Sequence, residues 1–217
     1  MSEDTLNQSE TVNVACLDLL LQEVVPTSIR VTHTLGENRL IEEKKSKFKE
    51  TKVQDPLSTI PKDFAGRVNV LERLLSVSDD VTLRVEGYGY SLGQRISELL
   101  MYRSSLVSPN TKFVDILDIM KFVCRDVWKC LYGKQMDNLR TNHRGTFVLV
   151  DNSYRLISRM NSPKGMHDTL NKAKCFLWFP CGIIRGILIS FGIDATVTAE
   201  VTQFPSVTFH IQTSINN

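Results

Sequence analysis

The segment from Phe113 to Tyr132 restricts the fold more than any other part of the chain. Five polar side chains recur in it at three- to four-residue spacing and form one narrow helical stripe: Asp115, Asp118, Lys121, Arg125 and Lys129. Most of the other positions are apolar. A helix that is apolar over more than half of its circumference packs against neighbours on several sides, and Gly133 follows it as a C-cap. The sequence therefore predicts a central helix that other elements surround.

Apolar periodicity predicts further helices in the first half of the chain. One starts near Ser9, which can cap it, and Pro26 stops or bends it, with the pattern resuming beyond the proline. A second covers residues 62–77. A third occupies the second half of residues 81–103, while the stretch TLRV near the start of that segment resembles a weak strand.

Two segments are expected to lie outside these helices. Residues 1–8 are polar and are interpreted as a flexible N-terminus. Residues 36–61 contain the charged run EEKKSKFKETK and few apolar residues, which is typical of a disordered or variable insert. Glutamates interleave with the lysines of this run, and this argues against a basic patch for membranes or nucleic acids.

The second half of the chain changes to strand-like alternation. Residues 146–150 form a short predicted strand, Asp151 and Asn152 turn the chain, and residues 154–159 return as the second arm of a hairpin. Residues 162–174 are expected to form a polar loop.

A second hairpin is predicted after one more helix. The segment FLWFPCGIIRGILISFGI places Pro180 at the start of a helix and Gly192 just past its end. ATVTAEV and SVTFHIQT then alternate and are separated by a short turn, so we expect them to pair antiparallel. Helices followed by two hairpins indicate an α+β fold, with several N-terminal helices packed on a four-stranded antiparallel sheet. We expect residues 1–217 to form a single domain.

Composition excludes several classes of protein. The formal net charge of +2 is too balanced for a nucleic-acid-binding surface. The opening residues, MSEDTLNQSE, lack the basic and apolar regions of a secretory signal. No apolar run reaches the roughly 18 uninterrupted residues of a membrane-spanning helix, and Phe176 to Ile193 is broken by one proline, three glycines and one arginine. We therefore expect a soluble, cytosolic protein.

No metal or cofactor is expected. The five cysteines are odd in number, and no pair has zinc-site spacing. We expect reduced and mostly buried thiols. His33, His167 and His210 are dispersed, without the spacing of metal ligands.

Three glycines in EGYGYSLG suggest a phosphate-binding loop only superficially. The third, Gly93, comes one residue too late for the G-x-G-x-x-G pattern, and no Lys-Ser or Lys-Thr pair follows it. The preferred interpretation is a helix whose small residues let another backbone approach closely.

The stretch from Lys134 to Asn152 is dense in polar side chains, and catalysis is the obvious alternative to a structural role. His143 could serve as a general base oriented by Asp137, but the stretch contains no serine or cysteine nucleophile. The preferred interpretation is a connection between helix and strand, in which polar side chains satisfy backbone groups and hydrogen-bond within the fold or at its edge. Its members are Asp137, Arg140, Asn142, His143, Arg144 and Gly145.

Two blocks of the sequence resemble a known family. FVDILDIMKFVCRDVWKCLYGKQMDNLRTNHRGTFVLVDN, from Phe113 to Asn152, resembles the central signature of a small subunit of the transport protein particle (TRAPP). The subunit is of the thirty-three-kilodalton type, in the bet-three-like family. FPCGIIRGILISFGIDATVTAEV, from Phe179 to Val201, resembles the second block of that family.

The resemblance implies a non-enzymatic assembly subunit that pairs with a bet-three-type sister mainly through its first helices. The complex would activate a Ypt-one-class Rab GTPase by nucleotide exchange and help to tether vesicles. The chain would be cytoplasmic and peripherally associated with the cis-Golgi and the ER. The apolar residues expected to bury against the sister are Leu17, Leu20, Leu21, Val24, Leu71, Leu74 and Leu75.

One departure from the family and one alternative function accompany this resemblance. The bet-three-type sister carries an acylated cysteine before its central helix, whereas SPNTKF, from Ser108 to Phe113, has none, so a lipid tunnel is not expected. A domain of related fold could instead sense a small apolar ligand, and the residues that could line its pocket are Phe176, Trp178, Phe179 and Phe191.

Overall fold

The computed structural model describes residues 13–47, 79–107, 113, 115–142 and 144–214. The predicted flexible N-terminus, the predicted helix over residues 62–77 and the insert residues 48–61 lie outside this range. Leu71, Leu74 and Leu75 of the predicted interface, and His143 of the predicted connection, lie outside it as well.

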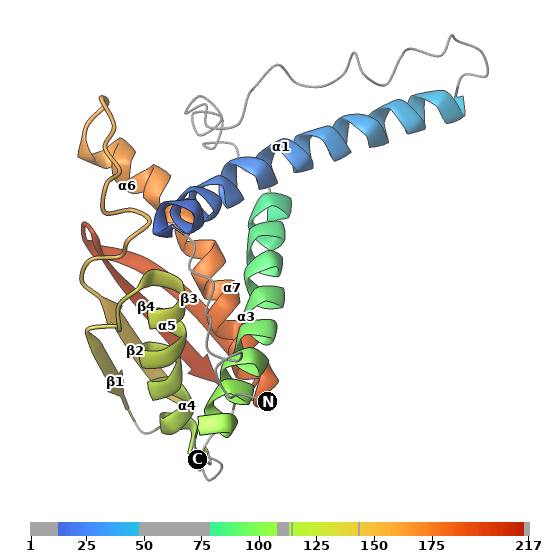
Figure 1. Cartoon of the computed structure of the whole chain (residues 1–217). Coiled ribbons are helices and arrows are strands. Elements are labelled where there is room, and N and C mark those ends of the chain that lie inside the picture. Colours follow the sequence, from blue (N-terminus) through green and yellow to red (C-terminus); the bar gives the residue numbers. More distant parts are fainter. Residues whose placement is uncertain (1–12, 48–78, 108–112, 114, 143, 215–217) are drawn as a thin grey trace, which may run out of the picture.

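A four-stranded antiparallel sheet forms one layer of the fold (Figure 1). Its strands are β1 (Asn138–Thr141), β2 (Thr146–Asp151), β3 (Ala195–Gln203) and β4 (Ser206–Thr213). Their order across the sheet is β1-β2-β4-β3, and every neighbouring pair is antiparallel. The predicted α+β class and the predicted pairing of the last two strands are confirmed.

Strand alternation gives the sheet one apolar face. Phe147 and Leu149 of β2 lie opposite Ile211 and Phe209 of β4, and all four side chains are buried. Their sequence neighbours point to the other face, because successive side chains of a strand alternate. The helices therefore cover one face of the sheet, and the other face carries mostly polar side chains together with the half-buried Val148 and Val150.

The helical layer consists of long helices and one segmented helix. The elements are α1 (Val14–Lys47), α3 (Asp79–Val107), α4 (Ile116–Phe122), the π-helix η4 (Val123–Val127), α5 (Trp128–Tyr132), α6 (Met166–Lys174), the 3₁₀ turn η5 (Cys175–Leu177) and α7 (Trp178–Ser190). In Figure 1, α3 and α7 run side by side, and the second half of α1 projects beyond the body of the molecule.

The predicted central helix is the run α4–η4–α5. Met120 and Trp128 have no exposed surface, and Gly133 closes the helix in the left-handed conformation at φ 75°. The π-helical turn in its middle was not predicted, because its residues keep the same apolar pattern as their neighbours. The carbonyl of Cys124, within this turn, accepts the N–H of Met136 at 3.0 Å, so it holds the chain that leaves the helix.

Four glycines bring the backbones of α3 and α7 into contact. A Cβ added to Gly89 or Gly93 of α3 would lie 2.2 Å or 2.3 Å from a carbonyl oxygen of α7. A Cβ added to Gly182 or Gly186 of α7 would lie 2.2 Å or 2.1 Å from a carbonyl oxygen of α3. No real Cβ approaches an oxygen so closely, so each helix presents a pair of glycines four residues apart to the other. The interpretation of EGYGYSLG as a helix made for close approach is confirmed.

Several boundaries in the first half differ from the prediction. Of the two alternatives for Pro26, a stop is wrong, and the continuation predicted beyond the proline is confirmed, because α1 runs through it to Lys47. Pro26 is buried, as are its neighbours Val25 and Ser28, and Ser28 Oγ donates to the carbonyl of Val24 at 2.7 Å. Residues 36–47 of the predicted insert are therefore helical. The TLRV stretch is also helical, since α3 begins at Asp79.

The first hairpin pairs with a different arm from the predicted one. Strand β2 pairs with β1, which precedes it, whereas residues 154–159 form turns apart from the sheet. The prediction of a loop over residues 162–174 is also wrong, because residues 166–174 form α6.

By length and composition alone, the continuous helical run Met166–Ser190 could cross a membrane. Within this fold, however, 72% of its most apolar window is buried. That burial is expected of a helix at the centre of a core.

We predict opposite effects for alanine at two glycines of the same helix. Gly93→Ala should lower the free energy of unfolding by about 2–3 kcal/mol or more, because the added methyl meets the α7 backbone. Gly87→Ala should raise it by about 0.5–1 kcal/mol, because nothing lies within 4 Å of its Cβ position. Urea unfolding of the two variants measures both values. Equal effects would contradict the close contact.

Candidate functional site

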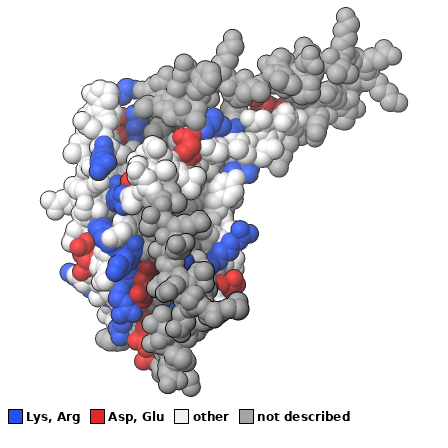
Figure 2. Space-filling view, in the orientation of Figure 1, with Lys and Arg blue, Asp and Glu red and all other residues white. Residues whose placement is uncertain are grey.

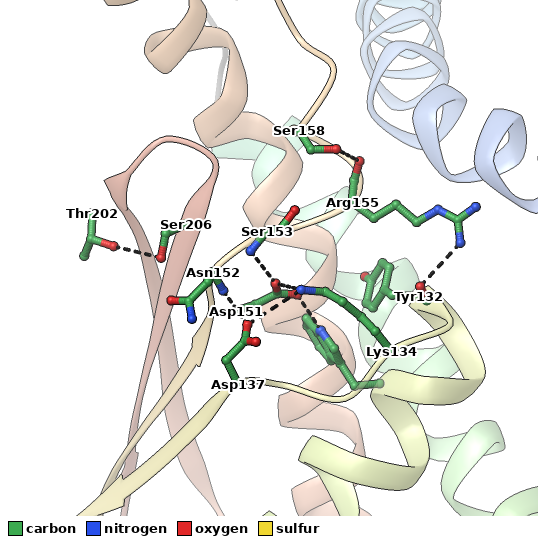
Figure 3. A network of polar contacts seen from close by, with 11 residues as sticks. Tyr132, Lys134, Asp137, Asp151, Asn152, Ser153, Arg155, Ser158, Thr202 and Ser206 are labelled. Carbon is green, nitrogen blue, oxygen red and sulfur yellow. Dashed lines mark hydrogen bonds and ion pairs between the residues drawn. The ribbon is translucent and has the colours of Figure 1, made fainter.

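The predicted polar stretch surrounds one fully buried carboxylate, that of Asp151 (Figure 3). The indole Nε1–H of Trp128 donates to Asp151 Oδ2 at 2.8 Å, and the ammonium of Lys134 pairs with Oδ1. The backbone N–H of Ser153 donates to Oδ1 at 3.0 Å. A buried charge is costly unless it is paired and hydrogen-bonded, and both oxygens of Asp151 meet that condition.

Asp137 ties the end of the central helix to the sheet. Its backbone N–H donates to the carbonyl of Val150 at 2.9 Å, and its Oδ2 accepts the N–H of Asn152 at 2.7 Å. Lys134 Nζ lies 3.7 Å from the same carboxylate oxygen and so bridges Asp137 and Asp151. The chain leaving the helix is therefore fastened to both ends of the turn that follows β2.

Asn142 and Gly145 shape the turn between β1 and β2. The side-chain oxygen of Asn142 accepts the N–H groups of Arg144 at 2.9 Å and Thr146 at 3.1 Å. Gly145 has φ 82°, which favours glycine, and its carbonyl accepts the N–H and the hydroxyl of Thr213. Arg140 and Arg144 have exposed side chains, and neither pairs with a carboxylate in the described part of the chain.

Two tyrosines complete the buried polar layer behind Asp151. The hydroxyls of Tyr132 and Tyr154 lie 3.1 Å apart, and both rings are buried. Burial raises the pKa of both phenols, so they remain protonated at physiological pH. The side chain of Asp151 bonds to groups of the same chain: the indole of Trp128, the ammonium of Lys134 and the backbone N–H of Ser153. Within the described residues of this stretch, the hydrogen bonds of Asp137, Asn142 and Asp151 join neighbouring parts of the fold to one another.

Metal chemistry finds no support in the described residues, where no group of three or more His, Cys, Asp or Glu side chains is placed to hold an ion. Figure 2 shows positive and negative side chains interspersed over the face in view. The described charges on that face therefore do not form the single-sign patch that an acidic polymer binds.

The first helix presents apolar side chains to solvent. Leu19 and Leu20 are 66% and 65% exposed, and Val14 is 55% exposed. The helix is nevertheless fastened to the body, since Arg155 pairs with Asp18 at 2.7 Å and Arg84 donates to the hydroxyl of Thr32 at 3.0 Å. The exposed leucines therefore belong to a docked helix with an uncovered side.

The predicted interface residues of this helix divide into three environments. Leu20 is exposed, and Leu17 and Val24 are half-buried against the core. Leu21 is only 4% exposed and belongs to the chain's own core, so it has little surface left for a partner. Periodicity found the apolar helix but did not separate its inner side from its outer side, because the apolar stripe is wide enough to include both Leu20 and Leu21.

A groove of about 530 Å³ lies between α1 and α3. Its lining residues are Thr32, Leu35, Gly36, Asp80, Leu83, Arg84, Gly87, Tyr88 and Ser91. Leu35, Leu83 and Tyr88 are exposed, and sequence analysis did not single them out for an interface. They give the groove an apolar lining that α1 and α3 share.

The aromatic residues of the ligand-sensor alternative do not line this groove. Phe176 and Phe179 are buried in the core. The ring of Phe191 packs edge-to-face on Phe113 at 5.3 Å and on Phe122 at 6.0 Å between centroids. Trp178 is half-buried against the same core cluster, so all four side chains pack within the core or against it.

The chain matches the family model described as "Transport protein particle (TRAPP) component" over residues 17–214. It is 41% identical over 128 residues to human trafficking protein particle complex subunit 6B, an alignment that covers 59% of this chain and 75% of that protein. It is 44% identical over 129 residues to bovine subunit 6A, covering 59% and 76%. A protein of Schizosaccharomyces pombe is 31% identical over 206 residues, covering 95% and 66%.

A solved structure shares the fold. It is trafficking protein particle complex subunit 3 from Naegleria fowleri, covalently bound to palmitic acid, with a TM-score of 0.53 and 16% identity. The match covers 68% of this chain and 90% of that one. At this identity the comparison shows the architecture alone.

We predict that the polar network serves folding. Lys134→Ala should lower the free energy of unfolding by about 2 kcal/mol or more, because it leaves the buried charge of Asp151 without its partner. The control is Lys129→Ala, an exposed lysine of α5, which should change it by less than about 0.5 kcal/mol. Chemical denaturation measures both. A Lys134 variant as stable as the Lys129 variant would contradict the structural role.

Proposed function

The chain belongs to the family of TRAPP components, and from that membership we propose that it is a non-enzymatic assembly subunit of a TRAPP complex. In this role it pairs with a sister subunit of bet-three type and acts in ER-to-Golgi and Golgi trafficking. The curated relatives carry the name of the trafficking protein particle complex, which supports a place in such an assembly.

The observation that carries this proposal is the uncovered apolar side of α1 and α3. Leu19 and Leu20 lie near the start of α1, and further along the same helix Leu35 lines the groove together with Leu83 and Tyr88 of α3. Exposed apolar surface marks sites where proteins associate. Burial of one large apolar side chain contributes about 1.5–3 kcal/mol, so a few of these residues suffice to drive association with a partner helix.

The same geometry supports a scaffold rather than an enzyme. The dense polar stretch that could have formed a catalytic loop is bonded to the sheet and to the end of the central helix, and its buried acid is paired with Lys134. In this proposal the complex as a whole acts on a Ypt-one-class Rab GTPase by guanine-nucleotide exchange. This chain holds other subunits of the complex in place. It is cytoplasmic and associates peripherally with cis-Golgi and ER membranes through the complex.

We predict that a charge on the exposed side of α1 weakens the heterodimer. Leu20→Asp should raise the dissociation constant for the bet-three-type sister by at least about tenfold, equivalent to about 1.4 kcal/mol. Because Leu20 is exposed, the free energy of unfolding should change little. Met166→Asp on α6 is the control, since that side chain is 60% exposed and the change is the same kind. Isothermal titration calorimetry with the sister subunit measures both dissociation constants. An unchanged dissociation constant for Leu20→Asp would refute the interface.

Thiol labelling offers an independent test of the same face. Cys16 on α1 and Cys130 on α5 are exposed, whereas burial raises the pKa of Cys124 and Cys181 to about 12 and of Cys175 to about 11. A raised thiol pKa leaves little reactive thiolate at pH 8, so only the two exposed thiols should react promptly. Adding the sister subunit should slow the labelling of Cys16 and leave Cys130 unchanged, as read by mass spectrometry. Equal protection of both thiols, or of neither, would contradict docking on α1.

A further inference from the structure

In the described part of the chain, strand β3 forms a long edge of the sheet with no strand paired on its outer side. It is last in the order β1-β2-β4-β3, and it has nine residues, whereas β1 at the opposite edge has four. Proteins commonly protect such edges with proline, lysine or a bulge. The sequence of β3, ATVTAEVTQ, has neither residue, and its only register shift lies at the far end, between Val201 and Gln203. The half of β3 from Ala195 to Ala199 is therefore regular strand.

A groove of about 610 Å³ runs beside this half of the edge. One wall is the start of β3, and the opposite wall is formed by α3 and α7 where they cross. The lining residues are Leu83, Glu86, Gly87, Tyr90, Cys181, Gly182, Arg185, Asp194, Ala195, Thr196 and Val197. None of them belongs to α1, so this surface adjoins the proposed interface on α3 without including its first helix.

The charges of the groove are predominantly acidic. Glu86 and Asp194 contribute two carboxylates against one guanidinium, that of Arg185. Arg185 lies over the ring of Tyr90, 5.9 Å from its centroid, and so already has an aromatic neighbour. Burial is the main influence on Glu86 and raises its pKa, while Arg185 acts in the opposite direction. A further positive charge entering the groove would stabilise both carboxylates.

We propose that the edge of β3 from Ala195 to Ala199 receives an extended segment of a partner protein, and that a lysine or arginine of this segment enters the groove between Glu86 and Asp194. A strand supplies what the edge lacks, because an edge presents a row of unpaired backbone N–H and C=O groups. Main-chain pairing provides affinity in this mode, and a side-chain pocket provides selectivity.

The acidic groove distinguishes this edge from the other one. Beside β1, the exposed charged side chain on the strand is Arg140, and that strand is short. A basic segment is therefore attracted to β3 and not to β1. The two edges of one sheet provide an internal comparison.

Hydrogen exchange of the full chain tests the inference, once purified alone and once in the endogenous assembly. About half of the strand amides point to the edge, because hydrogen-bonding direction alternates along a strand. In the chain alone, these amides of residues 195–199 should exchange rapidly. In the assembly they should exchange about tenfold more slowly, since each gains a hydrogen bond, while the edge amides of β1 should not change.

Charge variants identify the segment as basic. Asp194→Arg reverses the charge of an exposed side chain, and Glu86→Gln keeps the size of Glu86, so both variants should fold and both should restore rapid exchange at the edge. Glu200→Arg is the matched control, because Glu200 lies on β3 but pairs with His210 on the outer face of the sheet. This control should keep the protection.

Three results would overturn the inference. One is equal exchange of residues 195–199 in the chain alone and in the assembly. Another is protection that survives both Asp194→Arg and Glu86→Gln. The third is recovery of the endogenous chain without any partner. Failure of the Leu20→Asp test alone would affect the proposed heterodimer on α1 and leave the exchange pattern at β3 to be judged separately.

Discussion

The crossing of α3 and α7 is the contact on which the rest of the fold depends. Each helix places two glycines against carbonyl oxygens of the other, with no space for a side chain between them. At this distance the helices interact through their backbones, where Cα–H groups approach carbonyl oxygens. Because α7 also packs on β3 and α3 also packs on α1, the crossing fixes the sheet on one side and the first helix on the other.

The sequence predicted those elements whose side-chain period matched their environment. The central helix has one polar stripe, and the last two strands alternate cleanly, so each pattern admitted one structure. Strand β1 was missed because NLRT is short, lies at an edge and shows little burial contrast. What makes it a strand is tertiary: Asp137 and Asn142 fix the chain at its two ends. The helical path through Pro26 has a similar cause, since contacts on both sides of the proline outweigh its lost hydrogen bond.

The candidate site was predictable in kind but not in detail. In the stretch from Lys134 to Asn152, the sequence predicted polar side chains that bond to backbone groups, and Asp137 and Asn142 do so. Asp151, the acid at the centre of the network, was assigned only to a turn, because a sequence does not show that Trp128 and Lys134 converge on it. On α1, the predicted interface combined Leu20 and Leu21, and only packing shows that Leu21 faces inward and Leu20 outward.

The interlocked glycines have a consequence for architecture at a larger scale. Two helices in direct backbone contact behave as one rigid unit, because close-packed interiors are hardly compressible and transmit strain. Helix α1 packs on α3, and strand β3 packs on α7. Two partner proteins, one bound at α1 and one at β3, would then be held at a constant angle and distance from each other. The chain would act as a rigid spacer between them. A methyl group added at the crossing of α3 and α7 would change the angle between the two bound proteins without contacting either of them.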